Sequence, residues 1–114
     1  MFQISVQVMD KFEAEAADRA VGWHQKRLLA RFPELSAIPP PQQYEFARRN
    51  RLSAIALEIE EEEDIAVFLD CAVMYGEEFV REPWAREIFE EQGLSGTERM
   101  DLLSEVLAEI GVEL

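Results

Sequence analysis

The chain has 114 residues, one cysteine and a formal net charge of −13 at pH 7, and 48% of its residues are hydrophobic. This length favours a single domain over residues 1–114, large enough to bury a core, and one cysteine excludes an internal disulfide framework. No basic region precedes a long apolar run at the start, and no apolar run reaches the length of a membrane span. We therefore expect a cytoplasmic protein without a signal peptide.

The charge is concentrated in the second half of the chain. Residues 1–57 carry 6 acidic and 8 basic side chains, whereas residues 58–114 carry 18 acidic and 3 basic ones. An acidic surface repels phosphate groups, so we expect neither nucleic-acid binding nor adhesion to an anionic membrane. The same surface favours a basic protein partner, because complementary potentials speed encounter and fix orientation.

The first predicted element is a long helix over residues 6–31. Residues 2–8 alternate as a strand would, but a lone strand has no partner, and Ser5 is a suitable N-cap for a helix. A stripe of mostly apolar residues at helical spacing passes through Trp23, and a second line of residues lies beside this stripe. The second line contains Ala17, Val21, His24 and Leu28. Pro33 ends the helix.

A stiff proline-rich connection over residues 33–41 leads to a second helix that opens near Pro41. Its inward face is predicted from apolar spacing and consists of Tyr44, Ala47, Arg51 or Leu52, and Ile55, with Ala54 and Leu57 as further candidates. Three arginines make this helix the most basic segment. They form either a solvated face paired with the acidic half or a contact patch for a partner.

Residues 58–64, with the sequence EIEEEED, hold six carboxylates in seven positions. They precede an apolar helical pattern, so they suit the first turn of a third helix, where carboxylates interact well with the helix dipole. A calcium loop would alternate acidic ligands with a glycine, which this run lacks. The alternative to a solvated first turn is a docking surface for a basic partner.

Three helices follow in the densest apolar part of the chain. The third helix ends at Tyr75 and Gly76, and a fourth begins at Pro83. Ser95 and Glu98 have the spacing of a capping box, which predicts a fifth helix that ends before Gly111. The predicted fold is therefore all-α, a single compact bundle of about five helices with a long first one.

The sequence offers little for catalysis or for a cofactor. His24 is the only histidine, and no serine, cysteine or lysine lies beside it in a catalytic motif. One histidine and one cysteine do not make a zinc site, and no glycine-rich phosphate loop is present. We expect no enzyme, no cofactor and no metal. An enzyme would require His24 and a carboxylate to share a cleft.

Aromatic side chains near the third and fourth helices are candidates for a binding hot spot, although their helical spacing also suits core anchors. Together with the acidic run, they give the predicted partner-binding set. It consists of Glu58, Glu60, Glu61, Glu62, Glu63, Asp64, Tyr75, Glu77, Glu78 and Trp84.

Residues 68–103, FLDCAVMYGEEFVREPWAREIFEEQGLSGTERMDLL, resemble a family of small helical proteins encoded in bacterial type VI secretion gene clusters, near spike, PAAR-type and effector genes. The likeness is carried by Tyr75-Gly76, Phe79, residues 83–85 (PWA), residues 98–100 (ERM) and Leu103. No catalytic residues come with it. It implies an accessory protein whose partner is a secretion effector, the effector's chaperone, or a spike or PAAR component.

Two roles agree with this resemblance and with the acidic half. The first is a non-enzymatic co-chaperone or adaptor that holds or delivers an effector through an acidic helical surface. The alternative is an immunity protein that neutralises a toxin by covering its basic active site. The apolar content would also support a homodimer, although the high net charge opposes close contact of acidic faces.

Overall fold

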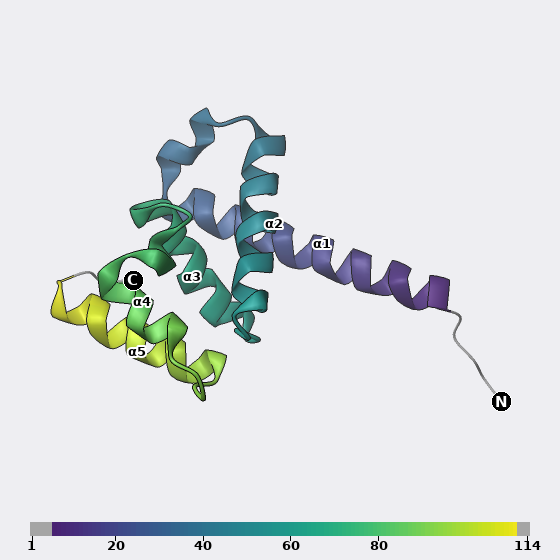
Figure 1. Ribbon diagram of the computed structural model, residues 1–114. Coiled ribbons are helices and arrows are strands. Elements are labelled where there is room, and N and C mark those ends of the chain that lie inside the picture. Colours follow the sequence, from purple (N-terminus) through teal and green to yellow (C-terminus); the bar gives the residue numbers. More distant parts are fainter. Residues whose placement is uncertain (1–5, 112–114) are drawn as a thin grey trace. The chain divides into compact units, whose positions relative to one another are not determined.

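The computed structural model describes residues 6–111, with the side chains of residue 11 and of residues 13–111. Helices are the only regular secondary structure in residues 6–111 (Figure 1). The predicted all-α fold is confirmed, and the first of the five described α-helices is the longest. Two short 3-10 helices lie between them. In chain order the elements are α1 (Val6–Arg31), η1 (Pro33–Ala37), α2 (Pro40–Ala56), α3 (Glu62–Tyr75), η2 (Phe79–Arg81), α4 (Pro83–Glu90) and α5 (Gly96–Glu109).

The ends of the helices follow the local signals in the sequence. Proline opens α4, where a missing N–H is harmless in the first turn. Gly76 ends α3 with φ of 97°, a conformation that favours glycine. At the start of α5, the Ser95 hydroxyl accepts from the Glu98 N–H at 3.1 Å, and the Glu98 carboxylate accepts from the Ser95 N–H at 3.2 Å. The predicted capping box is confirmed, whereas the Ser5 cap lies outside the described residues.

The chain divides into two compact units, with the boundary inside α2. The N-terminal unit is Met1–Ala47 and the C-terminal unit is Arg48–Leu114. The expectation of a single domain over residues 1–114 stays a prediction. None of the described helices is long and apolar enough to cross a membrane.

The N-terminal unit is α1, η1 and the first part of α2, joined by side-chain amides. The Gln43 amide nitrogen donates to the carbonyl of Leu35 at 3.0 Å and to that of Ile38 at 2.6 Å. Gln25 on α1 donates to the Gln43 side-chain oxygen at 3.1 Å. The Tyr44 hydroxyl also donates to Asp18 on α1. These bonds hold the proline-rich turn and the start of α2 against α1.

The buried face of α1 is not the stripe that passes through Trp23. Val21, His24 and Leu28 are at most 3% exposed, whereas Trp23 is 47% exposed. The Trp23 ring touches the His24 ring edge-on, with centroids 4.8 Å apart. The second line of residues, beside the stripe through Trp23, is therefore the buried one.

The core of the C-terminal unit forms where α3, η2, α4 and α5 meet. Phe68 on α3 packs against Phe79 on η2 with ring centroids 4.9 Å apart, and Phe79 packs against Phe89 on α4 at 6.0 Å. Leu103 and Leu107 contribute the buried side of α5. Burying this apolar surface supplies most of the driving force for folding this unit.

The second half of α2 presents only part of the predicted face. Asn50 and Ala54 are buried, whereas Leu52 is 49% exposed and Ile55 is 43% exposed. The inward placement of Ile55 was therefore wrong, that of Ala54 is confirmed, and of the alternatives Arg51 and Leu52 it is Arg51 that lies inward, with its side chain 14% exposed. A polar side chain occupies the inward position because Glu77, distant in sequence, supplies an acceptor for Asn50.

Candidate protein-binding surface

The acidic run spans a loop and the helix that follows it. Glu58, Glu60 and Glu61 lie between α2 and α3, and Glu62, Glu63 and Asp64 form the first turn of α3. The predicted first-turn position is confirmed for these last three residues. Their carboxylates lie at the positive end of the helix dipole, where negative charge is favourable.

The loop is shaped by backbone hydrogen bonds at the end of α2. The N–H of Ile59 donates to the carbonyl of Ala54 at 3.1 Å, and the N–H of Glu58 donates to that of Ile55 at 2.9 Å. This pair of bonds is a Schellman motif, in which the residue at Glu58 takes a left-handed conformation. Glu58 has φ of 65° and is the only non-glycine residue with positive φ in the described chain. The buried side chains of Ala54 and Ile59 occupy the positions of the accompanying apolar contact.

Backbone contact with α5 holds the same loop from the other side. A Cβ placed on Gly96 would lie 2.0 Å from the carbonyl oxygen of Glu58 and 2.6 Å from the Cα of Ile59. Only glycine therefore allows this approach. Arg99, one turn into α5, donates to the carbonyl of Leu57 at 3.0 Å and to that of Glu91 at 3.1 Å. The loop is fixed without any help from its own carboxylates.

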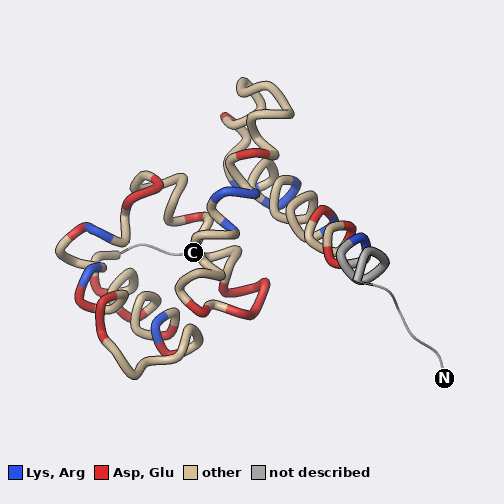
Figure 2. Tube along the Cα trace, turned by 45° about the vertical axis from the view of Figure 1, so that its right-hand side comes forward, with Lys and Arg blue, Asp and Glu red and all other residues tan. Residues whose placement is uncertain are grey.

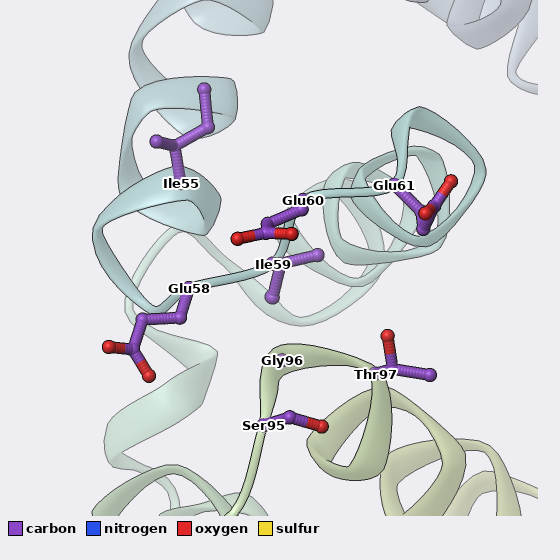
Figure 3. Close-up of a pocket in the computed structure, with 8 residues that line it drawn as sticks. All are labelled: Ile55, Glu58, Ile59, Glu60, Glu61, Ser95, Gly96 and Thr97. Carbon is purple, nitrogen blue, oxygen red and sulfur yellow. The ribbon is translucent and has the colours of Figure 1, made fainter.

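A surface pocket of about 520 Å³ lies between this loop and the start of α5 (Figure 3). Figure 3 shows that the loop with Glu58, Glu60 and Glu61 lies opposite the turn that opens α5. The lining residues are Ile55, Glu58, Ile59, Glu60, Glu61, Ser95, Gly96 and Thr97. Three of them are carboxylates and none is basic, so the pocket has negative potential.

The three glutamates of the pocket are exposed and carry uncompensated charge. Glu58, Glu60 and Glu61 form no ion pair and no side-chain hydrogen bond within the described part of the chain. Glu62, the next residue, is different: its carboxylate accepts from Arg51 Nη2 at 2.7 Å, and the Arg51 side chain is 14% exposed. Glu62 therefore ties α3 to α2, while the three loop glutamates face solvent.

Like charge accumulates where the first turn of α3 approaches α5. The pKa of Asp64 is raised, first by burial and then by the carboxylates of Asp101, Glu61 and Glu63. The fold therefore holds Asp64 in surroundings that disfavour its charged form. Among the residues that the structure describes, no group of three or more His, Cys, Asp or Glu side chains is placed to hold a metal ion.

Glu77, another residue of the predicted binding set, contributes to the fold. Its carboxylate accepts two hydrogen bonds from Arg49, at 2.7 and 3.0 Å, and one from the buried Asn50 at 2.8 Å. The hydrogen bond from Arg49, aided by that from Asn50, lowers the pKa of Glu77. Glu78 forms an ion pair with exposed Arg81, at 3.4 Å.

The two aromatic residues of the predicted set pack on one another. Tyr75 and Trp84 meet edge-on with ring centroids 5.1 Å apart, and Trp84 stacks with Phe79 at 6.1 Å. Both rings are half-buried, so they cover the edge of the core. Of the ten predicted residues, three line the pocket, namely Glu58, Glu60 and Glu61. The other seven do not: Glu62, Glu63, Asp64, Tyr75, Glu77, Glu78 and Trp84.

Two residues that support the acidic segments were not predicted as such from the sequence. Buried Asn50 carried no signal, because its partner Glu77 lies 27 residues away. Gly96 marked only the region where the fifth helix was expected to begin, although its lack of a side chain lets α5 touch the loop. A glycine directly after a capping serine was the one available hint.

No protein-family model, curated protein or solved structure matches this chain. The resemblance to type VI accessory proteins therefore stays a prediction, and the geometry of the C-terminal unit carries the functional argument.

Proposed function

We propose that this protein is a non-enzymatic protein-binding factor whose acidic helical surface covers a basic patch on its partner. The observation that carries the proposal is the state of Glu58, Glu60 and Glu61. They are exposed, lack a counter-charge within the described residues, and stand on a loop that the backbone holds in place. Charges without a counter-charge within the described residues remain available to a partner.

The charge of the whole C-terminal unit supports the same role. Its sequence carries 18 acidic and 6 basic side chains, and acidic residues recur along its helices and loops (Figure 2). A field of this sign speeds the approach of a basic partner and repels nucleic acid. The attraction weakens as salt is added, because exposed charges are screened.

The resemblance of residues 68–103 suggests which partner this is. We propose that the protein is a co-chaperone or adaptor of a type VI secretion effector, which it keeps soluble until the effector is loaded. The acidic loop also favours an alternative, an immunity protein. In that role, the carboxylates occupy the cationic active site of a toxin as phosphate mimics.

Co-expression with each neighbouring gene product, followed by co-purification at low and high salt, tests the proposal. We expect a stable complex with an effector, its chaperone or a spike component, and we expect it to weaken in salt. The triple variant Glu58→Gln, Glu60→Gln, Glu61→Gln should bind more weakly. The control Glu13→Gln, Glu15→Gln, Glu34→Gln removes the same charge from exposed positions in the N-terminal unit and should bind normally.

Deletion of the gene separates the two roles. Loss of effector export supports the chaperone or adaptor, whereas self-intoxication supports immunity. Failure to recover a complex with any neighbouring product, or equal binding by both triple variants, would overturn the proposal.

A further inference from the structure

An apolar patch on α2 adjoins the acidic pocket. Leu52 and Ile55, three residues apart and therefore on one helix face, are 49% and 43% exposed. Ile55 also lines the pocket, so the apolar face and the pocket are continuous. The opposite face of α2 is occupied by the buried residues Asn50 and Ala54.

From this continuity we propose that Leu52, Ile55 and the pocket form one docking surface. Its occupant is a short amphipathic segment of a partner protein, with an apolar side chain on Leu52 and Ile55 and an adjoining lysine or arginine in the pocket. The inference rests on the proposed function and adds the chemistry of the partner segment.

Charge complementarity selects this occupant. Glu58, Glu60 and Glu61 bring three negative charges to the pocket, and no basic side chain lines it. A lysine or arginine placed there is attracted by all three, while an acidic segment is repelled. The neighbouring aliphatic side chains favour an apolar group, which a free cation lacks, and no three His, Cys, Asp or Glu side chains among the described residues are placed to hold a metal ion. Both requirements together point to a peptide segment.

The surface is ready to bind without rearrangement. The Schellman bonds fix the loop to α2, the close contact at Gly96 fixes it to α5, and Arg99 binds the carbonyl of Leu57. A site that is already ordered loses little conformational entropy when its partner arrives. Within the described residues, the pocket glutamates form no ion pairs that would have to break first.

Titration of the full chain with synthetic peptides tests the surface directly. The probe is a twelve-residue labelled helical peptide with leucines on one face and lysines beside them; the comparison peptides replace leucine by alanine or lysine by glutamate. We expect only the leucine–lysine peptide to bind well, and amide shifts in NMR spectra to concentrate in residues 52–61 and 95–97. Shifts elsewhere, or equal binding of the alanine–lysine peptide, would overturn the docking surface.

Two sets of variants separate the apolar and the charged contributions. Leu52→Ser with Ile55→Ser should weaken binding of the leucine–lysine peptide about tenfold, which corresponds to about 1.4 kcal/mol. The salt dependence of binding should stay the same. The triple glutamine variant should weaken binding and flatten the salt dependence. The control Leu102→Ser with Ile110→Ser alters an exposed apolar residue of α5 and another at its C-cap and should change nothing; a loss equal to that of the α2 pair would contradict the proposal.

The outcomes distinguish this inference from the proposed function. If a neighbouring gene product binds the Leu52 and Ile55 variant normally, the protein-binding role stands and this surface is wrong. If no neighbouring product binds but the peptide docks at residues 52–61, the surface stands and the proposed partner falls. Dimerisation that the Leu52 and Ile55 substitutions abolish would replace the partner segment by a second copy of the chain.

Discussion

Two acidic segments of the C-terminal unit hold their positions by opposite means. After α3, the carboxylate of Glu77 is bound by Arg49 and Asn50, so the side chain itself fixes the segment to α2. Between α2 and α3, the loop with Glu58, Glu60 and Glu61 is fixed by its backbone, and its carboxylates face solvent. Acidic composition alone therefore does not separate residues that stabilise a fold from residues available to a partner.

The largest effect is expected from a substitution that disrupts the backbone contact between the loop and α5. Gly96→Ala places a Cβ 2.0 Å from the carbonyl oxygen of Glu58, and relief requires the backbone to shift. We expect a loss of about 3 kcal/mol in the free energy of unfolding, as in overpacked sites, measured by urea denaturation. Gly22→Ala is the matched control: a Cβ there meets nothing within 4 Å in α1, so we expect a gain of about 1 kcal/mol from helix propensity. A neutral Gly96→Ala would show that the contact is dispensable.

The next largest effect is expected from removing the charge of Glu77, which fixes the segment after α3. Glu77→Gln should lower the free energy of unfolding by about 1 kcal/mol at pH 7, because Arg49 and Asn50 lose a charged acceptor that is partly exposed to solvent. Glu78→Gln, which removes an ion pair with exposed Arg81, should have almost no effect.

The pKa of Glu77 sets the pH dependence of this loss. The pKa is lowered in the folded chain from the usual 4.5, so its contribution is fully present above about pH 4.5 and disappears as pH falls through the folded pKa. Denaturation of both proteins from pH 3 to 7 should show the two stabilities converging at low pH. A constant difference over this range would contradict the assignment.

A smaller effect of opposite sign is expected at the turn of the acidic loop. Glu58 has φ of 65°, which costs about 1–2 kcal/mol for a residue with a side chain, while glycine adds up to about 1 kcal/mol of unfolded-state entropy. Glu58→Gly should therefore raise the free energy of unfolding by about 0.5 kcal/mol. Glu60→Gly, at a position without positive φ, should only destabilise. Thermal melts of the two variants that shift in the same direction would reject this account.

The smallest effect concerns repulsion at the start of α3. Burial and the neighbouring carboxylates raise the pKa of Asp64 from its usual 3.8, so its ionisation opposes folding and stability falls as pH rises through that pKa. Asp64→Asn should gain about 0.3 kcal/mol at pH 7 and nothing at pH 3, given the screening at this partly exposed site. Denaturation at both pH values measures this, and a gain at pH 3 would contradict an electrostatic cause.

Local signals in the sequence predicted the helices well. Proline at the start of α4, glycine after Tyr75 and the pair Ser95 and Glu98 each act within a few residues, so they can be recognised without the fold. The long first helix over residues 6–31 was also predicted at its observed bounds.

Which face of a helix is buried was harder to predict. In α2 the apolar spacing predicted an inward Ile55 and left Arg51 and Leu52 as alternatives, yet Asn50 and Arg51 face inward because Glu77 and Glu62 accept their hydrogen bonds. Pairs this far apart in sequence leave no periodic trace. The contact of Gly96 with Glu58 is also non-local, so the pocket had no signal beyond its acidic residues.

The single cysteine gives the C-terminal unit a natural reporter of its opening. Cys71 lies fully buried in α3, and the chain has no other thiol. A thiol reagent can therefore react only when this part of the core is exposed, and its labelling rate under native conditions measures how often that happens. Comparing the labelling rate with and without a bound partner would show whether binding at the surface of this unit changes how often its core opens.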